Sequence, residues 1–287
     1  MDRQDSERDT CGDCGPFLLD AAGSWTPGRI RVQESPIRRS SDPQTDALIE
    51  DTWLRESASA RRAGRLLYDG RLCRLVEHRR EGDVLLLRLG PTSFKEFLGT
   101  NLTHAYLRHT VGPEALSNAL GVSAAVCTSD GFVLLGRRSQ KVAAFAGRVH
   151  AIGGMVEAAP PGRPAAHPSD AIARELEEEL GICSGEVQCN VCLGIIRDRH
   201  ILQPEMVFDI RVSAGADRLR RFTPTAQHQE HSELVPLRDH PTAFAEFIER
   251  SCPELTPVAV GTLLLHGLGL WGAGWFATAR GYLRSLI

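Results

Sequence analysis

Residues 174–182 read R-E-L-E-E-E-L-G-I and place four glutamates within five positions, behind an arginine and ahead of a glycine. On a helix, Glu175, Glu178 and Glu179 follow the i, i+3, i+4 spacing and therefore share one face. Carboxylates held this close repel one another unless a cation lies among them, and hard oxygen ligands suit Mg²⁺ or Mn²⁺. The segment predicts either a metal site or a solvated acidic helix face, which is the commoner origin of charge runs.

The same segment carries the signals of a docked helix. Ile172, Leu176 and Leu180 are spaced by four and form an apolar stripe that can pack on a core. Ser169 is the predicted N-cap and Gly181 the predicted C-terminal stop. We therefore expect a helix that fixes the acidic face against the rest of the fold.

Composition limits the class of protein. The chain has 287 residues, is 42% hydrophobic and has a formal net charge of −3, so one large domain or two small ones are expected, with neither a nucleic-acid partner nor an acidic-membrane partner. Residues 1–8 are polar and alternate in charge, which is not the pattern of a signal peptide. We expect a cytoplasmic protein.

Cysteine usage agrees with that location. Eight cysteines without a secretory signal predict reduced thiols. Two C-x-x-C pairs, Cys11 with Cys14 and Cys189 with Cys192, leave open a four-thiolate zinc site, but their separation favours a chance spacing.

Residues 258–279 contain no Asp, Glu, Lys or Arg and are long enough to span a bilayer. The segment contains His266 and several glycines and follows a globular sequence directly. A buried helix that breaks into a Gly/Trp-rich tail is the favoured interpretation, with a membrane anchor as the alternative.

The pattern of elements predicts an α/β protein. Residues 1–16 are expected to be a disordered tail, and residues 17–117 a small α+β N-terminal lobe. Its predicted elements are a helix from Asp42-Pro43, strands at 71–79 and 83–89, and a helix at 92–109.

Residues 118–268 are expected to form the main domain and residues 269–287 the tail. The predicted strands are 121–128, 132–136, 149–152, 187–196 and 206–212, and the predicted closing helices are 244–250 and 258–266. This order fits an α/β/α sandwich with a mixed sheet.

Gly153-Gly154-Met155-Val156-Glu157 together with residues 174–182 resembles a Nudix box. In that box, a glycine and a glutamate precede an R-E-U-x-E-E-x-G-U run, where U is apolar. The second half matches at every fixed position. The first half departs from the pattern, because Ala166 stands where a glutamate is expected and the loop 158–167 is lengthened.

The similarity extends over roughly residues 45–265 and points to one branch of the family. Residues 85–90, 92–101, 120–122, 137–139 and 193–195 resemble the animal UDP-glucose/UDP-galactose diphosphatases, which also have a lengthened box loop. The resemblance implies hydrolysis of a UDP-sugar to UMP and sugar 1-phosphate with Mg²⁺, or with Mn²⁺ as the alternative ion.

The resemblance also assigns roles on the acidic helix. Glu175 and Glu179 are expected to bind the metal, while Glu178 is expected to serve as a third ligand or to orient or deprotonate water. Arg174 lies four positions before Glu178 and is expected to pair with it. The expected catalytic residues are Glu178, Glu175 and Arg174, and Glu177 is expected to face solvent.

The resemblance also implies substrate-binding roles, some of which have a purely structural alternative. Arg138 is expected beside the phosphates, or else as one arm of a surface arginine pair. Tyr68 and Phe94 are expected to flank the base, or else to pack in the core. The further expected substrate-binding residues are Ala143, His150, Met155, Glu157 and Thr256.

Two of these positions depart from the family, since His150 replaces an acidic residue and Met155 a histidine. Glu205 is a candidate fourth carboxylate. These departures leave open another Nudix substrate, such as ADP-ribose or a dinucleotide. A non-catalytic nucleotide sensor is the third reading, although the glutamates that it would be expected to lose are all present. The expected partner is a nucleoside diphosphate sugar.

Overall fold

The computed structural model describes residues 12–64, 66–140, 142, 144–160, 162–163, 165–225 and 230–284. Within these residues the strands form a large sheet of eight and a small sheet of three. The large sheet has the order β1 (Gly12–Asp13), β2 (Phe17–Trp25), β9 (Val187–Asp198), β10 (Pro204–Val212), β6 (Gly121–Cys127), β8 (Val149–Met155), β7 (Phe132–Arg138) and β11 (His231–Arg238). The small sheet has the order β3 (Ile30–Glu34), β5 (Val84–Ser93) and β4 (Arg71–Glu81).

The large sheet is mixed, as predicted, because β10 runs parallel to β6 while its other ladders are antiparallel. The helices are α2 (Pro43–Arg62), α3 (Phe94–Phe97), α4 (Leu107–Thr110), α5 (Pro168–Leu180), α6 (Ala216–Arg220), α7 (Pro241–Ser251) and α8 (Pro257–Arg284), and a π-helix, η2, spans Leu98–Leu102. Short 3₁₀ turns occupy Pro27–Arg29, Pro113–Ala115, Ser184–Glu186 and Cys252–Glu254.

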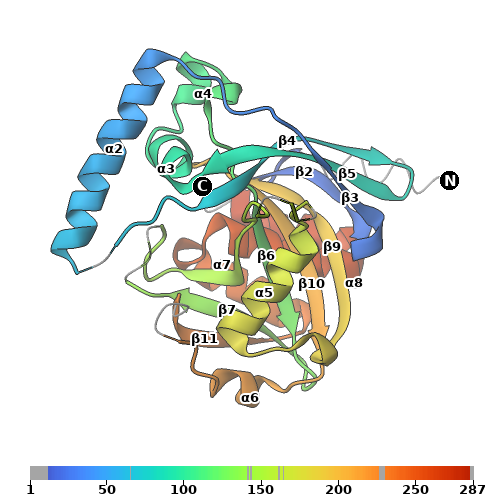
Figure 1. Ribbon diagram of the computed structural model, residues 1–287. Coiled ribbons are helices and arrows are strands. Elements are labelled where there is room, and N and C mark those ends of the chain that lie inside the picture. The colour runs from blue at the N-terminus through green and yellow to red at the C-terminus, as the bar shows by residue number, and fades with distance from the viewer. Residues whose placement is uncertain are drawn as a thin grey trace.

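Helices cover both faces of the large sheet. In β6, Ala124 and Val126 belong to the core that contains α5, while Ala125 and Cys127 belong to the core that contains α7 and α8. This alternation follows from the two-residue period of a strand and explains why β6 is buried throughout. Figure 1 shows α5 in front of the sheet and α7 and α8 behind it, which confirms the predicted α/β/α sandwich.

The small sheet is joined to the large one by backbone hydrogen bonds from β4. Cys73 N–H donates to the carbonyl of Val156 at 2.8 Å, and Leu120 N–H donates to the carbonyl of Cys73 at 2.8 Å. Leu75 N–H donates to Asn118 in the same way at 2.9 Å. The N-terminal lobe is thus fixed against the ends of the strands that carry the acidic site.

Three predicted segments differ in the structure. Strand β2 falls within the predicted lobe 17–117 but pairs with β9 in the large sheet. Residues 92–109, predicted as one helix, instead form α3, the π-helix and α4. In the predicted tail 269–287, α8 continues past a non-helical Gly272 with φ of 81° to its end, and Phe276 and Leu283 are buried.

Residues 258–265 are almost wholly buried against the sheet, so the predicted buried helix is confirmed. By length and composition alone, Pro257–Leu283 is the one helix among the described residues that could cross a membrane, and 56% of its most apolar window is buried inside the fold.

The C-x-x-C pairs gain no support as a zinc site. Cys192 is buried in β9, whereas Cys189 is exposed, and Cys14 is buried. Cys11 and most of the predicted tail 1–16 lie outside the described residues.

Candidate active site

Helix α5 presents the acidic face. His167 is the N-cap, because its Nδ1 accepts the backbone N–H of Ser169 at 3.2 Å. The predicted cap at Ser169 was wrong: Pro168 occupies the first helical turn, where a missing N–H costs nothing, and shifts the start of the helix upstream. Gly181 ends the helix with φ of 63°, as predicted.

The apolar stripe of α5 is buried as predicted, with Ile172, Leu176 and Leu180 at 1% exposure or less. This anchoring turns the glutamate face toward β8 and leaves Glu177 exposed, in agreement with the sequence.

Glu175 lies at the floor of the site. Gly154 of β8 is so close that an added Cβ would lie 2.4 Å from Glu175 Oε1, so a side chain at this position would displace the carboxylate. Burial and then the charge of Glu179 raise the pKa of Glu175 to about 7, although Arg174 acts against both. At neutral pH this carboxyl is poised between its charged and neutral forms.

Glu205 on β10 is a second buried carboxylate beside Glu175. Burial raises its pKa to about 8, and the charge of Glu175 adds to the increase, while Ser123 and Arg138 act against it. Gly121 leaves room for it, because a Cβ there would lie 1.8 Å from Glu205 Oε2. Two buried carboxylates of like charge repel each other, and a cation bound between them would offset that repulsion.

Arg174 connects the carboxylates around the floor. Its Nη2 lies 3.2 Å from Glu175 Oε1 and donates to the carbonyl of Met155 at 3.3 Å. Its Nε lies 3.9 Å from Glu178 Oε1, which is the predicted i, i+4 pair, and its Nη1 lies 3.6 Å from Glu157 Oε2. The guanidinium therefore holds the positions of the acidic groups around the floor.

Glu179 lies behind this floor. Its carboxylate is 3% exposed, and Oε1 lies 3.2 Å from Nε2 of His231, without the alignment of a hydrogen bond. Neither of its oxygens has a hydrogen-bond partner among the described residues. Such a buried, unsatisfied carboxylate fits a cation ligand.

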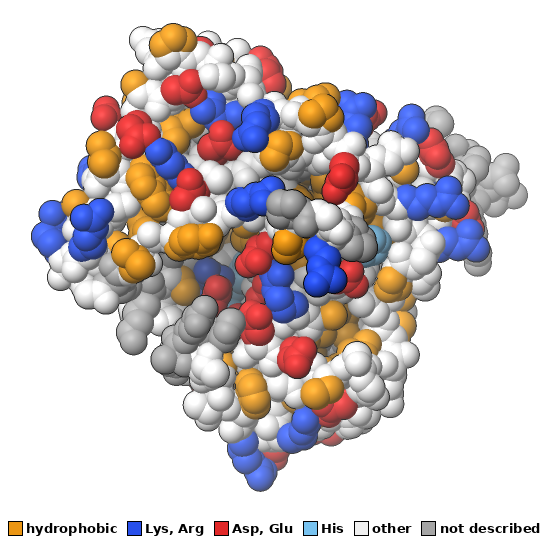
Figure 2. All heavy atoms as spheres, in the orientation of Figure 1, with side chains coloured by type: hydrophobic (Ala, Val, Ile, Leu, Met, Phe, Trp, Pro, Cys, Tyr) orange, Lys and Arg blue, Asp and Glu red, His pale blue; other side chains and the backbone are white. Residues whose placement is uncertain are grey.

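A cleft of about 650 Å³ opens above these residues, between the large sheet and the N-terminal lobe. Glu175, Glu178 and Glu205 line its floor. Figure 2 shows acidic and basic side chains gathered in the middle of this face, over α5, with apolar side chains above them. The remaining predicted site residues that line it are Tyr68, Phe94, Arg138, His150, Met155, Glu157 and Arg174.

The aromatic wall comes from the lobe. Tyr68 is 78% exposed, which excludes core packing for its ring, and Phe94 is partly buried at the start of α3. The two residues are neighbours because Phe94 N–H donates to the carbonyl of Gly70 at 2.9 Å. The cleft thus combines an acidic floor with an apolar rim.

Arg138 is largely buried and is no arm of a surface pair. Its Nε donates to the carbonyl of Ala144 at 3.0 Å, and its Nη2 lies 3.7 Å from Glu230 Oε2. The predicted contact Ala143 lies outside the described residues. Arg138 places a positive charge on the wall opposite the carboxylates.

His150 and Thr256 form one unit, with Nδ1 and Oγ1 2.7 Å apart. Burial holds the pKa of His150 well below its ordinary value, and the charges of Arg138 and His231 add to this, so the ring is neutral. Thr256 is fully buried and also accepts the N–H of Ala259 at 3.1 Å. Thr256 therefore supports His150 from below and does not line the cleft.

Sequence reasoning missed two residues at the site. Gln203 Nε2 donates to Met155 Sδ at 3.2 Å and to Glu205 Oε2 at 3.4 Å. Its position just before the strand, two residues from Glu205, could have indicated it. His231 reaches Glu179 only through the pairing of β11 with β7, which no local pattern indicates.

Comparison with known proteins agrees with this geometry. The NUDIX domain family model matches residues 117–253. Uridine diphosphate glucose pyrophosphatase NUDT22 of Bos taurus is 29% identical over 208 residues, covering 64% of this chain and 72% of that protein. Nudix hydrolase 9 of Arabidopsis thaliana is 25% identical over 246 residues, covering 74% of this chain and 78% of that protein.

Among solved structures, the bifunctional NMN adenylyltransferase/ADP ribose pyrophosphatase from Francisella tularensis has a TM-score of 0.39 at 14% identity, covering 61% of this chain and 48% of that chain. A likeness this low carries no argument about substrate. Residues 117–253 thus match a NUDIX domain, and the chain resembles Nudix hydrolases. Within that family it resembles the animal UDP-glucose pyrophosphatases. Nudix hydrolases generally use divalent metal ions.

Proposed function

We propose that the protein hydrolyses UDP-sugars, UDP-glucose and UDP-galactose among them, to UMP and sugar 1-phosphate with Mg²⁺. The observation that carries this proposal is one cleft with three carboxylates on its floor, Arg138 on its wall and two aromatic side chains at its rim. The similarity to the UDP-glucose pyrophosphatases supports the choice of substrate.

Glu175, Glu178 and Glu179 are the proposed metal ligands, with Glu205 as a fourth carboxylate beside them. Their fit to a cation follows from the raised pKa values of Glu175 and Glu205 and from the unsatisfied oxygens of Glu179. When bound, a divalent ion lowers the pKa of water and offsets the charge of the diphosphate.

The reaction adds a water oxygen to one phosphorus and breaks the bond from that phosphorus to the bridging oxygen. Glu178 is the most exposed of the proposed ligands, and we assign it the task of accepting the water proton. Arg174 holds Glu178 and Glu175 in place. Arg138 is assigned to a phosphate oxygen, where a guanidinium fork stabilises the charge that develops.

The nucleoside end of the substrate is assigned to the rim of the cleft. Tyr68 and Phe94 offer apolar ring faces on which uracil can stack. The neutral ring of His150, together with Met155 and Glu157, lies between the rim and the floor and is assigned to the ribose and sugar hydroxyls. Ala143 remains a proposed substrate contact, and Thr256 is assigned to hold His150 in place through their hydrogen bond.

The test is a product assay with UDP-glucose, UDP-galactose, ADP-ribose and a dinucleoside polyphosphate, each with Mg²⁺, with Mn²⁺ and with a chelator. We expect UMP and sugar 1-phosphate from the UDP-sugars, and no turnover with the chelator. Turnover of ADP-ribose with none of UDP-glucose would refute the substrate assignment. Glu179→Gln is expected to abolish turnover, with the exposed Glu177→Gln as its matched control on the same helix.

A further inference from the structure

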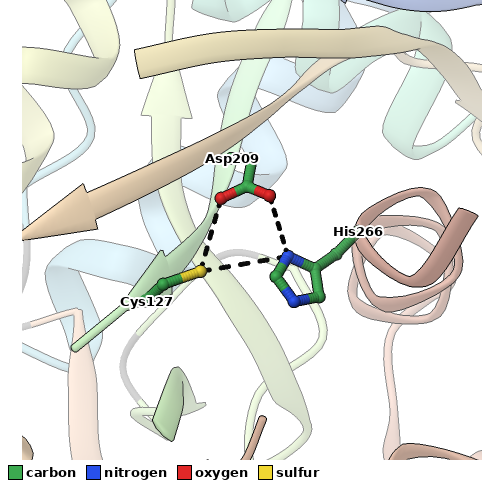
Figure 3. A group of neighbouring side chains, drawn as sticks. All are labelled: Cys127, Asp209 and His266. Atoms are coloured by element: carbon green, nitrogen blue, oxygen red, sulfur yellow. Dashed lines mark hydrogen bonds and ion pairs between the residues drawn. The ribbon is translucent and has the colours of Figure 1, made fainter. Parts of the chain in front are cut away.

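A second group of possible metal ligands lies on the face of the large sheet that α8 covers. Cys127 ends β6, Asp209 lies within β10, and His266 belongs to α8. Figure 3 shows the three side chains pointing toward one another, with the sulfur, a carboxylate oxygen and a ring nitrogen at the corners of a triangle. The Nudix site uses none of these residues.

The distances between the donor atoms suit one small ion. Cys127 Sγ lies 3.3 Å from Asp209 Oδ1 and 3.9 Å from His266 Nδ1, and His266 Nδ1 lies 3.0 Å from Asp209 Oδ2. Zinc bonds of about 2.0–2.3 Å in a tetrahedron place neighbouring ligand atoms roughly 3.3–3.8 Å apart. The sulfur and the ring nitrogen contact different oxygens of Asp209, so the carboxylate would turn to offer one oxygen to the ion, while the other separations are close to that range.

A carboxylate outside the triangle fixes the imidazole. His266 Nε2 lies 3.0 Å from Asp239 Oδ1. His266 Nδ1 also faces a carboxylate, that of Asp209. Despite the burial of the ring, the two hydrogen bonds raise its pKa to about 11, so without an ion the ring is protonated. An ion would replace the Nδ1 proton while Nε2–H stays on Asp239, and a carboxylate of this kind is the usual outer partner of a metal-bound histidine.

The group is buried but can be reached from solvent. His266 is fully buried, whereas the side chains of Asp209 and Asp239 are 13% and 20% exposed. The two aspartates therefore form the route by which an ion would enter.

We propose that Cys127, Asp209 and His266 bind one Zn²⁺ ion, with Asp239 orienting the imidazole. A thiolate, an imidazole and a carboxylate are a zinc ligand set, whereas the all-carboxylate floor of the cleft suits Mg²⁺. Binding would release the thiol proton of Cys127 and the Nδ1 proton of His266 to solvent, and a water molecule would complete the tetrahedron.

This site is separate from the carboxylate cleft but shares a strand with it. Asp209 follows Glu205 by four residues on β10, which corresponds to about 13 Å along the strand. Because its ligands come from β6, β10 and α8, a bound ion would join α8 to the centre of the sheet. We therefore expect Zn²⁺ to raise the thermal stability of the protein.

The experiment uses the full-length protein, stripped with a chelator and titrated with Co²⁺ and then Zn²⁺. Co²⁺ bound to a thiolate gives a charge-transfer band in the near ultraviolet, which carboxylate sites do not give. We expect the band to saturate at one Co²⁺ per chain and to disappear when Zn²⁺ displaces it. In Cys127→Ala the band should be lost, and in Asp239→Asn the affinity should fall about 10–100-fold.

Two controls separate this site from other sites in the chain. Glu175→Gln alters the cleft and should keep the band, and Cys183→Ser removes an exposed thiol and should keep it as well. Circular dichroism of each metal-free variant checks folding, and Cys127→Ser offers a second replacement if the alanine variant unfolds. No band in the wild type, or an equal band in the folded Cys127 variants, would show that these side chains form only a hydrogen-bonded cluster.

Discussion

Glu205→Gln is expected to stabilise the metal-free protein at alkaline pH. The carboxyl of Glu205 is 4% exposed, and its pKa in the folded protein is about 8 against an ordinary value of 4.5, chiefly because of burial. The folded state therefore holds a proton that the unfolded state releases, and stability must fall as pH rises from about 4.5 to about 8. Glutamine has nearly the same shape and never acquires the charge.

The size of the effect follows from the pKa difference. Going from 4.5 to about 8, at about 1.4 kcal/mol for each pKa unit, corresponds to about 5 kcal/mol of destabilisation above pH 8. Glutamine at position 205 cannot ionise, so the substitution removes this pH-dependent loss of stability. We expect Glu205→Gln to match the wild type at pH 5 and to exceed it by several kcal/mol at pH 8.5.

The assay is urea denaturation of both proteins in EDTA at several pH values between 5 and 8.5. Glu177→Gln, exposed on α5, is the control and should follow the wild type. Adding Mg²⁺ to the wild type at pH 8.5 should recover stability, by about 2.7 kcal/mol at a hundredfold excess over Kd, because the ion binds the folded state. Parallel pH profiles for wild type and Glu205→Gln would refute the argument that this carboxyl is held protonated.

Three further predictions concern the cleft. Glu178→Gln should lower kcat by about 10²–10⁴-fold without changing the unfolding midpoint if it accepts the water proton, as steady-state kinetics with UDP-glucose would show; an unchanged kcat would remove it from that role. Gly154→Ala places a methyl group 2.4 Å from Glu175 Oε1, so Mg²⁺-dependent activity and Mg²⁺ affinity by calorimetry should both drop, and normal affinity would contradict the packing argument. Tyr68→Ala removes an exposed ring and should raise KM about tenfold or more with kcat little changed, as expected for a lost stacking contact of 1–3 kcal/mol; an unaltered KM would place uracil elsewhere.

The sequence predicted the parts of this protein that depend on local pattern. The spacing of Ile172, Leu176 and Leu180 gave the docked helix and the face of its glutamates, and 129–131 gave the hairpin between β6 and β7. Residues 92–109 were predicted wrongly as a continuous helix. Gly99 packs there against the backbone of α2, where a Cβ would lie 2.8 Å from Ile49 Cα, and the chain widens locally into a π-helix.

The remainder of the site depends on contacts between distant segments. His231 meets Glu179 only because β11 pairs with β7, and β2 joins the large sheet only because β9 is available to it. Strand β2 contains Asp20 and Gly23 and lacks a regular alternation of apolar and polar residues, so its own sequence does not predict a strand. The family resemblance predicted which residues line the cleft, whereas their burial and their interaction partners became known only from the structure.

The two aromatic residues at the rim, Tyr68 and Phe94, are held by the same pair of strands. Tyr68 lies just before β4 and Phe94 just after β5, and the two strands are paired at Arg71 and Ser93. The rings are therefore carried on one end of a single hairpin, whereas the carboxylates belong to the large sheet and α5. If the base stacks on these rings as proposed, substitutions at that hairpin end would change which base is accepted and would leave the carboxylates untouched. New specificities would then arise in this architecture through a few changes in the lobe.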